Sequence, residues 1–348
     1  MTPPTCTWSE SAPVDWDDFV HSHPASGVFH RAAAVAVGQR VFGLRTFYLT
    51  ARMHDGRLAG VLPLVEQMLI PRVRTLVSLP FCTYGGPLVD NDDTLASLMA
   101  VVDALAERTR ARRVVLRLAR PMPGSRYRES LDKVAMVLEL PATKDELAKR
   151  LGSKLRSQVK RAERANPEVR VGRGELLDEF YPVFCSVMRD LGTPVYPRRF
   201  FDAVLEALGD AATVVVIRVD GRPVSGAVMT QWRDAVEVPW AGTLRAANPL
   251  SVNMRLYWEL LNLAVERGCR RFDFGRSSRD SGTQRFKAQW GALPVQLHWM
   301  TRDDRPGESG AASSGRSSLL ESAPRAWSRL PLWLANALGP GISPRLPW

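Results

Sequence analysis

The segment Thr213–Thr230 reads TVVVIRVDGRPVSGAVMT, and it decides the fold. Two β-rich runs flank Asp220-Gly221, and Asp-Gly is a strong hairpin signal because glycine adopts the positive φ of a type I′ turn. The segment Thr46–Val65 repeats this pattern around Asp55-Gly56. The two halves of the chain therefore contain the same predicted hairpin.

Each predicted hairpin is followed by an amphipathic helix and then by a further strand. The helices are expected around residues 95–105 and 254–265, and the strands at Arg113–Leu118 and Arg271–Phe274. Apolar residues at helical spacing form the stripes Leu95, Leu98, Met99, Val102, Leu105 and Met254, Tyr257, Trp258, Leu261, Val265. The matching order predicts a duplicated α/β unit, and chance similarity of two hairpins is the weaker explanation.

Composition divides the rest of the chain. We expect an N-terminal domain at 1–148, a basic helical connector at 149–173, a C-terminal domain at 174–300, a flexible linker at 301–318 and an amphipathic tail at 319–348. The connector holds nine Lys/Arg against two Glu, so it is either a solvated helix face or a surface for several phosphates. The tail is either an interfacial segment that touches anionic lipid or a helix docked on the body of the protein.

The charge balance points to anionic partners. The 348 residues include 47 Lys+Arg and 36 Asp+Glu, for a net charge of +11. The four cysteines form no CxxC pair, and His21-x-His23 is more typical of a turn than of a zinc site, so no metal is expected. The N-terminus lacks a signal-peptide pattern and no apolar run reaches about 20 residues, so we expect a cytoplasmic protein.

The densest polar and aromatic cluster runs from Phe272 to Gly291. A strand ends in Gly275-Arg276, a Ser- and Gly-rich loop follows, and a short helix then carries Arg285 and Lys287. Three cations at the carboxyl end of a strand suit a phosphate or a developing oxyanion. Asp273, which alternates with two phenylalanines, and Trp290 are candidate substrate contacts. The alternative is a packing helix whose cations extend to solvent.

Two further segments are candidate binding sites. In Leu191–Phe201, two prolines fix an extended loop from which Tyr196 and Arg198 project, although a rigid connector would look the same. Trp240 could line a cleft or pack in the core. The sequence contains no P-loop, GxGxxG or GxSxG motif, and His298 is the only histidine of the second half, so hydrolase chemistry is not supported.

The order strand, DG turn, strand, strand, helix, strand resembles a GNAT acyltransferase unit, and its duplication resembles the FemAB family. The matching strings are Leu79–Gly86, Leu191–Phe201, Phe272–Arg276 and Arg285–Gly291, within residues 15–300. Members carry two GNAT-like domains and transfer an amino acid from aminoacyl-tRNA to a cell-wall precursor, as in peptidoglycan interpeptide-bridge synthesis. The chain is most similar to FemAB-like proteins of exosortase/PEP-CTERM and exopolysaccharide systems.

This resemblance implies an acyl- or aminoacyl-transferase that acts on a phosphate-bearing cell-envelope or exopolysaccharide precursor. Lys287 matches the family's FK lysine, which faces the acceptor phosphates or the reacting ester, with Arg276 and Arg285 beside it. Arg276 departs from the second glycine of the DFGG pattern. The implied partners are an activated acyl or aminoacyl donor, aminoacyl-tRNA included, and an anionic glycan or lipid-linked precursor. The tail would touch the inner face of the plasma membrane peripherally.

The donor is the open question. The segment Thr243–Ser251, where a GNAT unit would hold the pyrophosphate of coenzyme A, has no glycine and contains Pro249, so no cofactor is expected. Tyr84, Gly85 and Gly86 are expected to cradle a donor or acceptor group in the first half. Two alternatives stay open: an N-acyltransferase that uses acyl-CoA or an acyl carrier on a nucleotide sugar or polysaccharide precursor, and a non-catalytic membrane-surface scaffold of an exopolysaccharide/exosortase system.

Overall fold

The computed structural model describes residues 3–70, 72–122, 125–303 and 318–347. The chain forms two compact units. The first contains residues 1–133, 296–310 and 344–348, and the second contains residues 134–295 and 311–343. Each unit is built on one mixed β-sheet.

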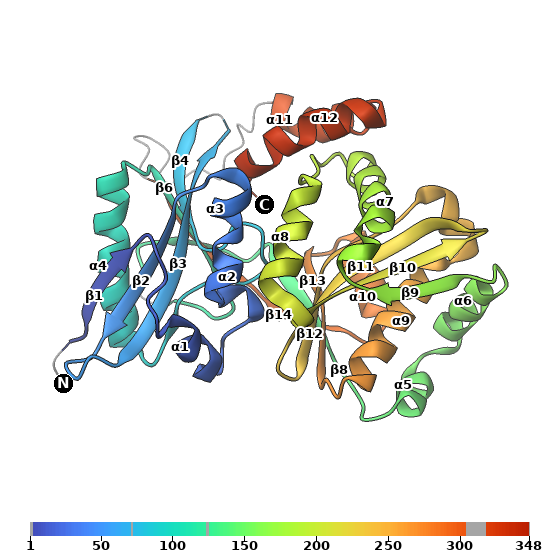
Figure 1. Ribbon diagram of the computed structural model, residues 1–348, viewed down its shortest axis with the longest axis horizontal. Coiled ribbons are helices and arrows are strands. Elements are labelled where there is room, and N and C mark those ends of the chain that lie inside the picture. Colours follow the sequence, from blue (N-terminus) through green and yellow to red (C-terminus); the bar gives the residue numbers. More distant parts are fainter. Residues whose placement is uncertain (1–2, 71, 123–124, 304–317, 348) are drawn as a thin grey trace. The chain divides into compact units, whose positions relative to one another are not determined.

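The first unit has the strand order β1-β2-β3-β4-β6-β15-β7, with β5 paired to β3. Its strands are β1 Thr5–Ser9, β2 Thr46–Arg52, β3 Leu58–Leu69, β4 Val73–Val77, β5 Leu88–Val89, β6 Arg113–Leu118, β7 Arg128–Ser130 and β15 His298–Asp303. Its helices are α1 Trp16–Ser22, η1 Val28–His30, α2 Ala32–Val35, α3 Val37–Phe42 and α4 Asp92–Thr109. Figure 1 shows α4 on one face of this sheet and α1 to α3 on the other.

The second unit has the strand order β14-β8-β13-β12-β11-β10-β9. Its strands are β8 Lys133–Glu139, β9 Glu168–Gly172, β10 Ala212–Val219, β11 Arg222–Trp232, β12 Ala235–Thr243, β13 Arg271–Ser278 and β14 Leu293–Gln296. Its helices are α5 Lys144–Arg150, α6 Ser153–Glu163, η2 Gly174–Leu176, α7 Leu177–Asp190, α8 Arg198–Leu208, η3 Gly209–Ala211, η4 Arg245–Leu250, α9 Val252–Glu266, α10 Gly282–Ala288, α11 Ser318–Trp327 and α12 Leu332–Ile342. Helices α7 and α9 cover opposite faces of the sheet (Figure 1).

The duplicated order is confirmed. Strands β2 and β3 form the first hairpin and β10 and β11 the second. In the second turn Asp220 and Gly221 both have positive φ, 50° and 72°, as a type I′ turn requires, whereas in the first turn only Gly56 does. The predicted helices are α4 and α9, and the predicted final strands are β6 and β13.

The segment 149–173 is not one helix, in contrast to the expectation from its composition. It comprises the end of α5, the helix α6 and the strand β9, which pairs with β10. Gly152 separates the two helices, and Pro167 precedes an alternating run that suits a strand rather than a helix. The segment is therefore part of the second unit. Its Arg170 and Arg173 form ion pairs with Glu179 and Asp210, which leaves the basic charge concentrated on α6.

The chain returns to the first sheet after the second unit. Strand β15 pairs antiparallel with both β6 and β7, and Arg113 forms an ion pair of 2.6 Å with Asp303. The unit boundaries therefore differ from the expected domains 1–148 and 174–300, because β8 and α5 lie in the second unit and β15 in the first. Most of the expected linker 301–318 lies outside the described residues.

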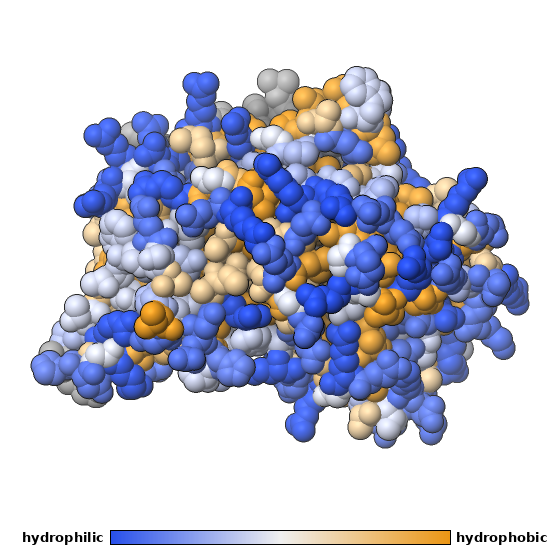
Figure 2. Space-filling view, viewed as in Figure 1, coloured by the Kyte–Doolittle hydropathy of each residue, from blue (hydrophilic) through white to orange (hydrophobic). Residues whose placement is uncertain are grey.

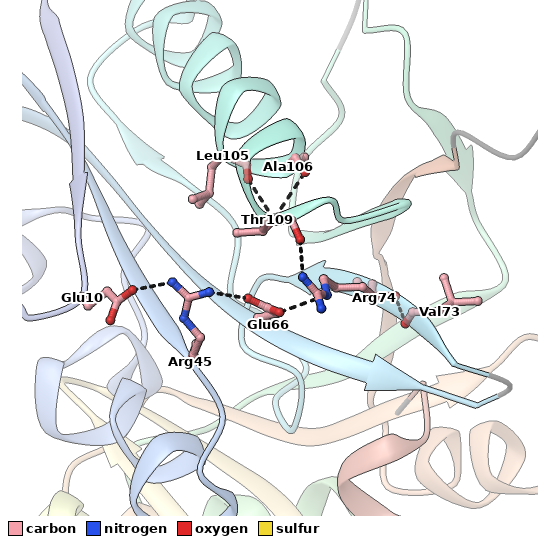
Figure 3. Close-up of polar contacts among 9 residues, drawn as sticks. Glu10, Arg45, Glu66, Val73, Arg74, Leu105, Ala106 and Thr109 are labelled. Atoms are coloured by element: carbon pink, nitrogen blue, oxygen red, sulfur yellow. Dashed lines mark hydrogen bonds and ion pairs between the residues drawn. The ribbon is translucent and has the colours of Figure 1, made fainter.

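A row of charged side chains connects several elements of the first unit (Figure 3). The half-buried Glu66 of β3 pairs with Arg45 at 3.2 Å and with Arg74 of β4 at 3.3 Å. Arg45 also pairs with Glu10 at 2.6 Å, and Arg74 donates a hydrogen bond of 2.6 Å to the carbonyl of Thr109 at the end of α4. Exposed ion pairs stabilise a protein little individually, so this row contributes mainly as a network that holds these elements of the first unit in register.

The tail docks on the second unit, in agreement with one of the two expectations for it. Arg189 donates a hydrogen bond of 3.0 Å to the carbonyl of Leu330, just before α12. Gly339 of α12 lies so close to Val195 that an added Cβ would be 2.9 Å from its backbone nitrogen. A Cβ on Gly192 would be 2.3 Å from the carbonyl oxygen of Pro324. The tail helices therefore cover the segment that comes after α7.

Candidate active site

The candidate site lies where β12 and β13 part. These parallel strands pair over three residues, from Ala235–Arg271 to Glu237–Asp273. Directly after Glu237 a β-bulge sets Val238 and Pro239 opposite Met229 of β11. Gly275 of β13 has φ +77°, and an added Cβ there would be 3.1 Å from the carbonyl oxygen of Val238. The regular pairing thus ends next to a glycine whose positive φ and close approach to β12 disfavour any other residue.

Lys287 reaches this point from α10. Its Nζ donates hydrogen bonds of 2.8 Å to the carbonyl of Gly275 and 2.9 Å to the carbonyl of Arg276. The side chain is 7% exposed, so it does not extend to solvent as the packing alternative required. An ammonium group has three donors, and the two bonds hold the third in a fixed direction. The arrangement presents one oriented N–H donor at the end of the parallel pair.

Burial dominates the electrostatics of Lys287. Desolvation, with a smaller contribution from the charge of Arg276, lowers its pKa to about 8, although the charges of Asp273 and Glu237 oppose the shift. Asp273 and Glu237 are register partners on neighbouring strands, so their side chains lie on the same face of the sheet. Phe274 stacks on Tyr257 of α9, which places these carboxylates on the face opposite α9.

Sequence reasoning missed Glu237. A single acid within the apolar run Ala235–Trp240 is unusual, and that signal could have identified it. Its carboxylate is partly buried beside the charge of Lys287. Asp273, a candidate substrate contact from the sequence, accepts a hydrogen bond of 2.7 Å from the amide of Gly275 and so stabilises the sharp bend of β13.

Known proteins share this architecture. Residues 149–288 match the model of the acetyltransferase (GNAT) domain. The match covers less than half of the chain and lies within the second unit. No curated protein sequence matches the chain. Among solved structures, FemX is similar at a TM-score of 0.64 and 14% identity, over 84% of this chain and 96% of that one.

Two further solved structures have the same fold. The C-terminal domain of an Agrobacterium fabrum protein assigned as a lysylphosphatidylglycerol synthetase has a TM-score of 0.56 and 15% identity, over 94% of this chain and 96% of its own. A tandem GNAT protein from the clavulanic acid biosynthesis pathway has a TM-score of 0.54 and 12% identity, over 87% and 100%. At these identities the likeness concerns the fold, which is a tandem GNAT-like one.

The other candidate residues of the segment Phe272–Gly291 are Arg276, Arg285 and Trp290, and they differ in burial. Arg276 is half-buried on β13 beside Lys287, whereas Arg285 is exposed on α10 and donates to the carbonyl of Asp280 at 3.0 Å. Trp290 is 3% exposed and packs near Tyr257 in the core of the second unit. Within the described part of the chain, its indole nitrogen has no hydrogen-bond partner.

Three expected substrate contacts have structural partners instead. Tyr196 and Trp240 are 4% and 6% exposed and pack in one aromatic cluster with Phe200. The ring centroid of Phe200 lies 4.7 Å from that of Tyr196 and 5.5 Å from that of Trp240. Arg198 begins α8 and pairs with Asp178 and Asp202 at 2.9 and 3.0 Å. Of the two alternatives for Trp240, packing in the core is the one observed, and ligand contact by Tyr196 stays a prediction.

Tyr84, Gly85 and Gly86 lie in the first unit. The amide of Gly85 donates to the carbonyl of Arg117 at 3.2 Å, so it is not available to cradle a ligand as expected. A Cβ on Gly86 would be 2.5 Å from Leu118, and its carbonyl accepts a hydrogen bond of 3.2 Å from Nε2 of His30. Close packing alone accounts for both glycines, and their contact with a donor or acceptor group stays a prediction. Tyr84 is half-buried at the surface of the same loop.

The loop before α9 uses its backbone amides internally. Residues Arg245–Leu250 form the 3-10 helix η4, in which Ala247 donates to Leu244 and Ser251 to Asn248. Ser251 itself has φ +58°. A pyrophosphate at this helix terminus would need unpaired amides. The amides of Ala247 and Ser251 are already paired within the loop, so they do not form a phosphate cradle.

Among the described residues, no group of three or more His, Cys, Asp or Glu side chains is placed to hold a metal ion. Within the same residues, no helix is long and apolar enough to cross a membrane.

Proposed function

We propose that the protein is an acyl- or aminoacyl-transferase whose reaction takes place at the end of the β12–β13 pair. The observation that carries the proposal is the buried Lys287 ammonium, fixed by the carbonyls of Gly275 and Arg276 with its third donor left for a substrate. The match to a GNAT acetyltransferase domain supports the class of reaction.

In the proposed reaction an acceptor amine or hydroxyl attacks the carbonyl carbon of an activated acyl group. The new C–N or C–O bond forms as the bond from the acyl carbon to the donor breaks, and the donor leaves with the electron pair. The third N–H of Lys287 stabilises the negative charge that develops on the acyl oxygen, an effect that is large in a dry site. The acceptor's proton passes to Glu237 or Asp273, which lie on the same face of the sheet.

We propose a phosphate-bearing cell-envelope or exopolysaccharide precursor as the acceptor, in an exosortase/PEP-CTERM type of system. The net charge of +11 and the cations Arg276 and Arg285 around the site support an anionic acceptor. Similarity of fold to FemX agrees with transfer of an aminoacyl group. A lipid-linked acceptor would bring the protein to the inner face of the plasma membrane.

An acyl-CoA-dependent N-acyltransferase is the second candidate, because the matching domain model is that of acetyltransferases. The internally bonded loop Leu244–Ser251 argues against it. Native mass spectrometry of the full-length protein purified from its host separates the two. A bound coenzyme A thioester would favour the second candidate, whereas a bound aminoacyl-tRNA would favour the first.

The transferase reaction itself is tested with two labelled donors, bulk tRNA charged with radioactive amino acids and radioactive acetyl-coenzyme A, each with a precursor extract of the host. Lys287→Ala is expected to lower transfer of label at least about 100-fold, the usual effect of losing an oxyanion donor. Gln289→Ala, an exposed position next to α10, is the matched control. Near-normal transfer by Lys287→Ala would remove Lys287 from the reaction.

A further inference from the structure

The helix α12 has two faces of different character. Its inner face consists of the small residues Ala335 and Gly339, which are buried against the second unit. Its outer face exposes Trp333, which is 71% exposed, and Leu338, which is 45% exposed. The helix contains no charged residue over its eleven positions. Large apolar side chains on the solvent side are not needed for docking, since the small residues already make that contact.

The apolar surface continues onto α7. Leu191 directly follows that helix and is 64% exposed. Arg189, two residues earlier, donates a hydrogen bond to the carbonyl of Leu330 just before α12, so the end of α7 with the exposed Leu191 lies next to the start of α12. Figure 2 shows hydrophobic residues gathered over α12, at the top of the view.

Cations border this surface. Arg325 and Arg329 are exposed directly before α12, and Arg245 is held beside Leu191 by a hydrogen bond of 3.0 Å to the carbonyl of Asp190. Residues 323–347 contain no Asp or Glu at all. Arg245 also pairs with Asp190 at 3.6 Å, so Arg325 and Arg329 supply the basic charge of this surface. Exposed apolar side chains, a tryptophan and arginines on a segment without acidic residues are typical of a segment that lies in the interface of an anionic bilayer.

We propose that the outer face of α12, together with Leu191, docks this protein on a membrane surface that contains anionic lipid. A helix of eleven residues is about 16 Å long, so it lies on a bilayer of about 30 Å rather than crossing it. A second copy of the chain is the weaker occupant, because three exposed side chains are far fewer than the roughly 20 residues a side of a stable dimer. The arginines favour a negatively charged surface over an apolar protein partner.

Vesicle sedimentation tests the proposal with the full-length protein. Vesicles of equal parts phosphatidylglycerol and phosphatidylcholine should sediment the protein, and vesicles of phosphatidylcholine alone should not. Two double variants should each lower vesicle binding about tenfold. Trp333→Ser, Leu338→Ser removes apolar side-chain surface that inserts into the bilayer, and Arg325→Gln, Arg329→Gln removes the attraction to anionic lipid headgroups. Raised salt should weaken wild-type binding.

Matched controls lie on the same unit. Leu293→Ser replaces a side chain that is also 71% exposed, and Arg222→Gln replaces an exposed arginine on a hairpin turn; both should bind vesicles like the wild type. Unchanged melting temperatures would show that all variants fold. Binding by the Trp333→Ser, Leu338→Ser variant that equals wild type, or no binding of the wild type to anionic vesicles, would overturn the proposal. So would a dimer in sedimentation velocity that this variant abolishes, because the face would then join two copies of the chain.

Discussion

The parallel strand pairs of the two units differ in the residues that come directly after the paired positions. Both β4–β6 and β12–β13 pair over three residues, beginning at Thr75–Arg113 and Ala235–Arg271. Counted from Arg113 and Arg271, the fifth residue is Arg117 in the first unit and Gly275 in the second. The same place in the repeat therefore holds the longest cationic side chain in one unit and no side chain in the other.

In the first unit the space beyond the paired residues is filled by the chain itself. The Arg117 guanidinium is 2% exposed and donates to the carbonyls of Leu79, Pro80 and Cys82 at 3.4, 2.6 and 2.7 Å. It also lies 4.8 Å from the ring of Trp299. The carbonyl of Arg117 accepts the amide of Gly85, so the loop Leu79–Gly86 occupies the place next to β6.

In the second unit the carbonyl at the equivalent place is satisfied by a side chain instead. The carbonyl of Gly275 accepts from Lys287, whose pKa is lowered to about 8, whereas an arginine stays charged at every accessible pH. In the first unit the carbonyls beyond the paired strands are thus bound by an arginine, which is always charged. In the second unit the equivalent carbonyl is bound by a lysine, which can lose its proton. Chemistry is therefore expected in the second unit.

The largest expected effect is on the first unit. Arg117→Met should lower its free energy of unfolding by about 4 kcal/mol, because three buried carbonyls lose a donor at about 1–3 kcal/mol each. Hydrogen exchange of the β6 amides measures this unit separately. Arg112→Gln, an exposed neighbour, is the control, and equal losses for both variants would show that the loop does not depend on Arg117.

Acid should destabilise the first unit through His30. This buried imidazole accepts from the amide of Gly27 at Nδ1 and donates to the carbonyl of Gly86 at Nε2, so it is neutral, and burial lowers its pKa to about 4. The unfolded chain binds a proton below about pH 6.5 while the folded one does not, so stability falls between pH 6.5 and 4, by about 3 kcal/mol in total. His30→Gln should flatten this slope in a pH series of hydrogen exchange, and a variant as acid-sensitive as wild type would refute the assignment.

A substitution at Gly275 tests why the second unit has no side chain where the first unit has Arg117. Gly275→Ala should cost about 2 kcal/mol, because its φ of +77° is strained for alanine and the new Cβ lies 3.1 Å from the carbonyl oxygen of Val238. Gly268→Ala is the matched control, since Gly268 has φ +70° but no described atom within 4 Å of an added Cβ. The difference in melting temperature between the two isolates the close approach of the strands, and no difference would mean that the approach is not tight.

The pH profile of transfer gives the smallest effect. If Lys287 acts as a charged donor, turnover should fall up to tenfold for each pH unit above about pH 8, where its ammonium loses a proton. Lys287→Arg should retain part of the activity without this decline, because arginine does not titrate there. Turnover of the wild type that rises between pH 8 and 9 would instead assign the active form to the neutral amine.

Local patterns in the sequence determined the repeated elements. The Asp-Gly turns, the stripes of α4 and α9 and the strands after them depend on interactions between near neighbours, so the chain alone predicts them. The same patterns predict that Arg276 and Lys287 lie near each other, since both belong to one strand–loop–helix segment, and Lys287 donates to the carbonyl of Arg276. The run 149–173 was mispredicted because its charge hid a break at Gly152 and the short strand β9.

Tertiary structure decided what separated residues do. Whether Tyr196 and Trp240 line a cleft or pack together depends on partners such as Phe200 from another element, which no local pattern specifies. The contribution of Glu237 became visible only through its register with Asp273, and the closure of the first unit only through the bonds between Arg117 and a distant loop. The sequence determines which side chains are available, whereas burial and pairing, which set pKa values and hydrogen-bond partners, arise from contacts between segments far apart in the chain.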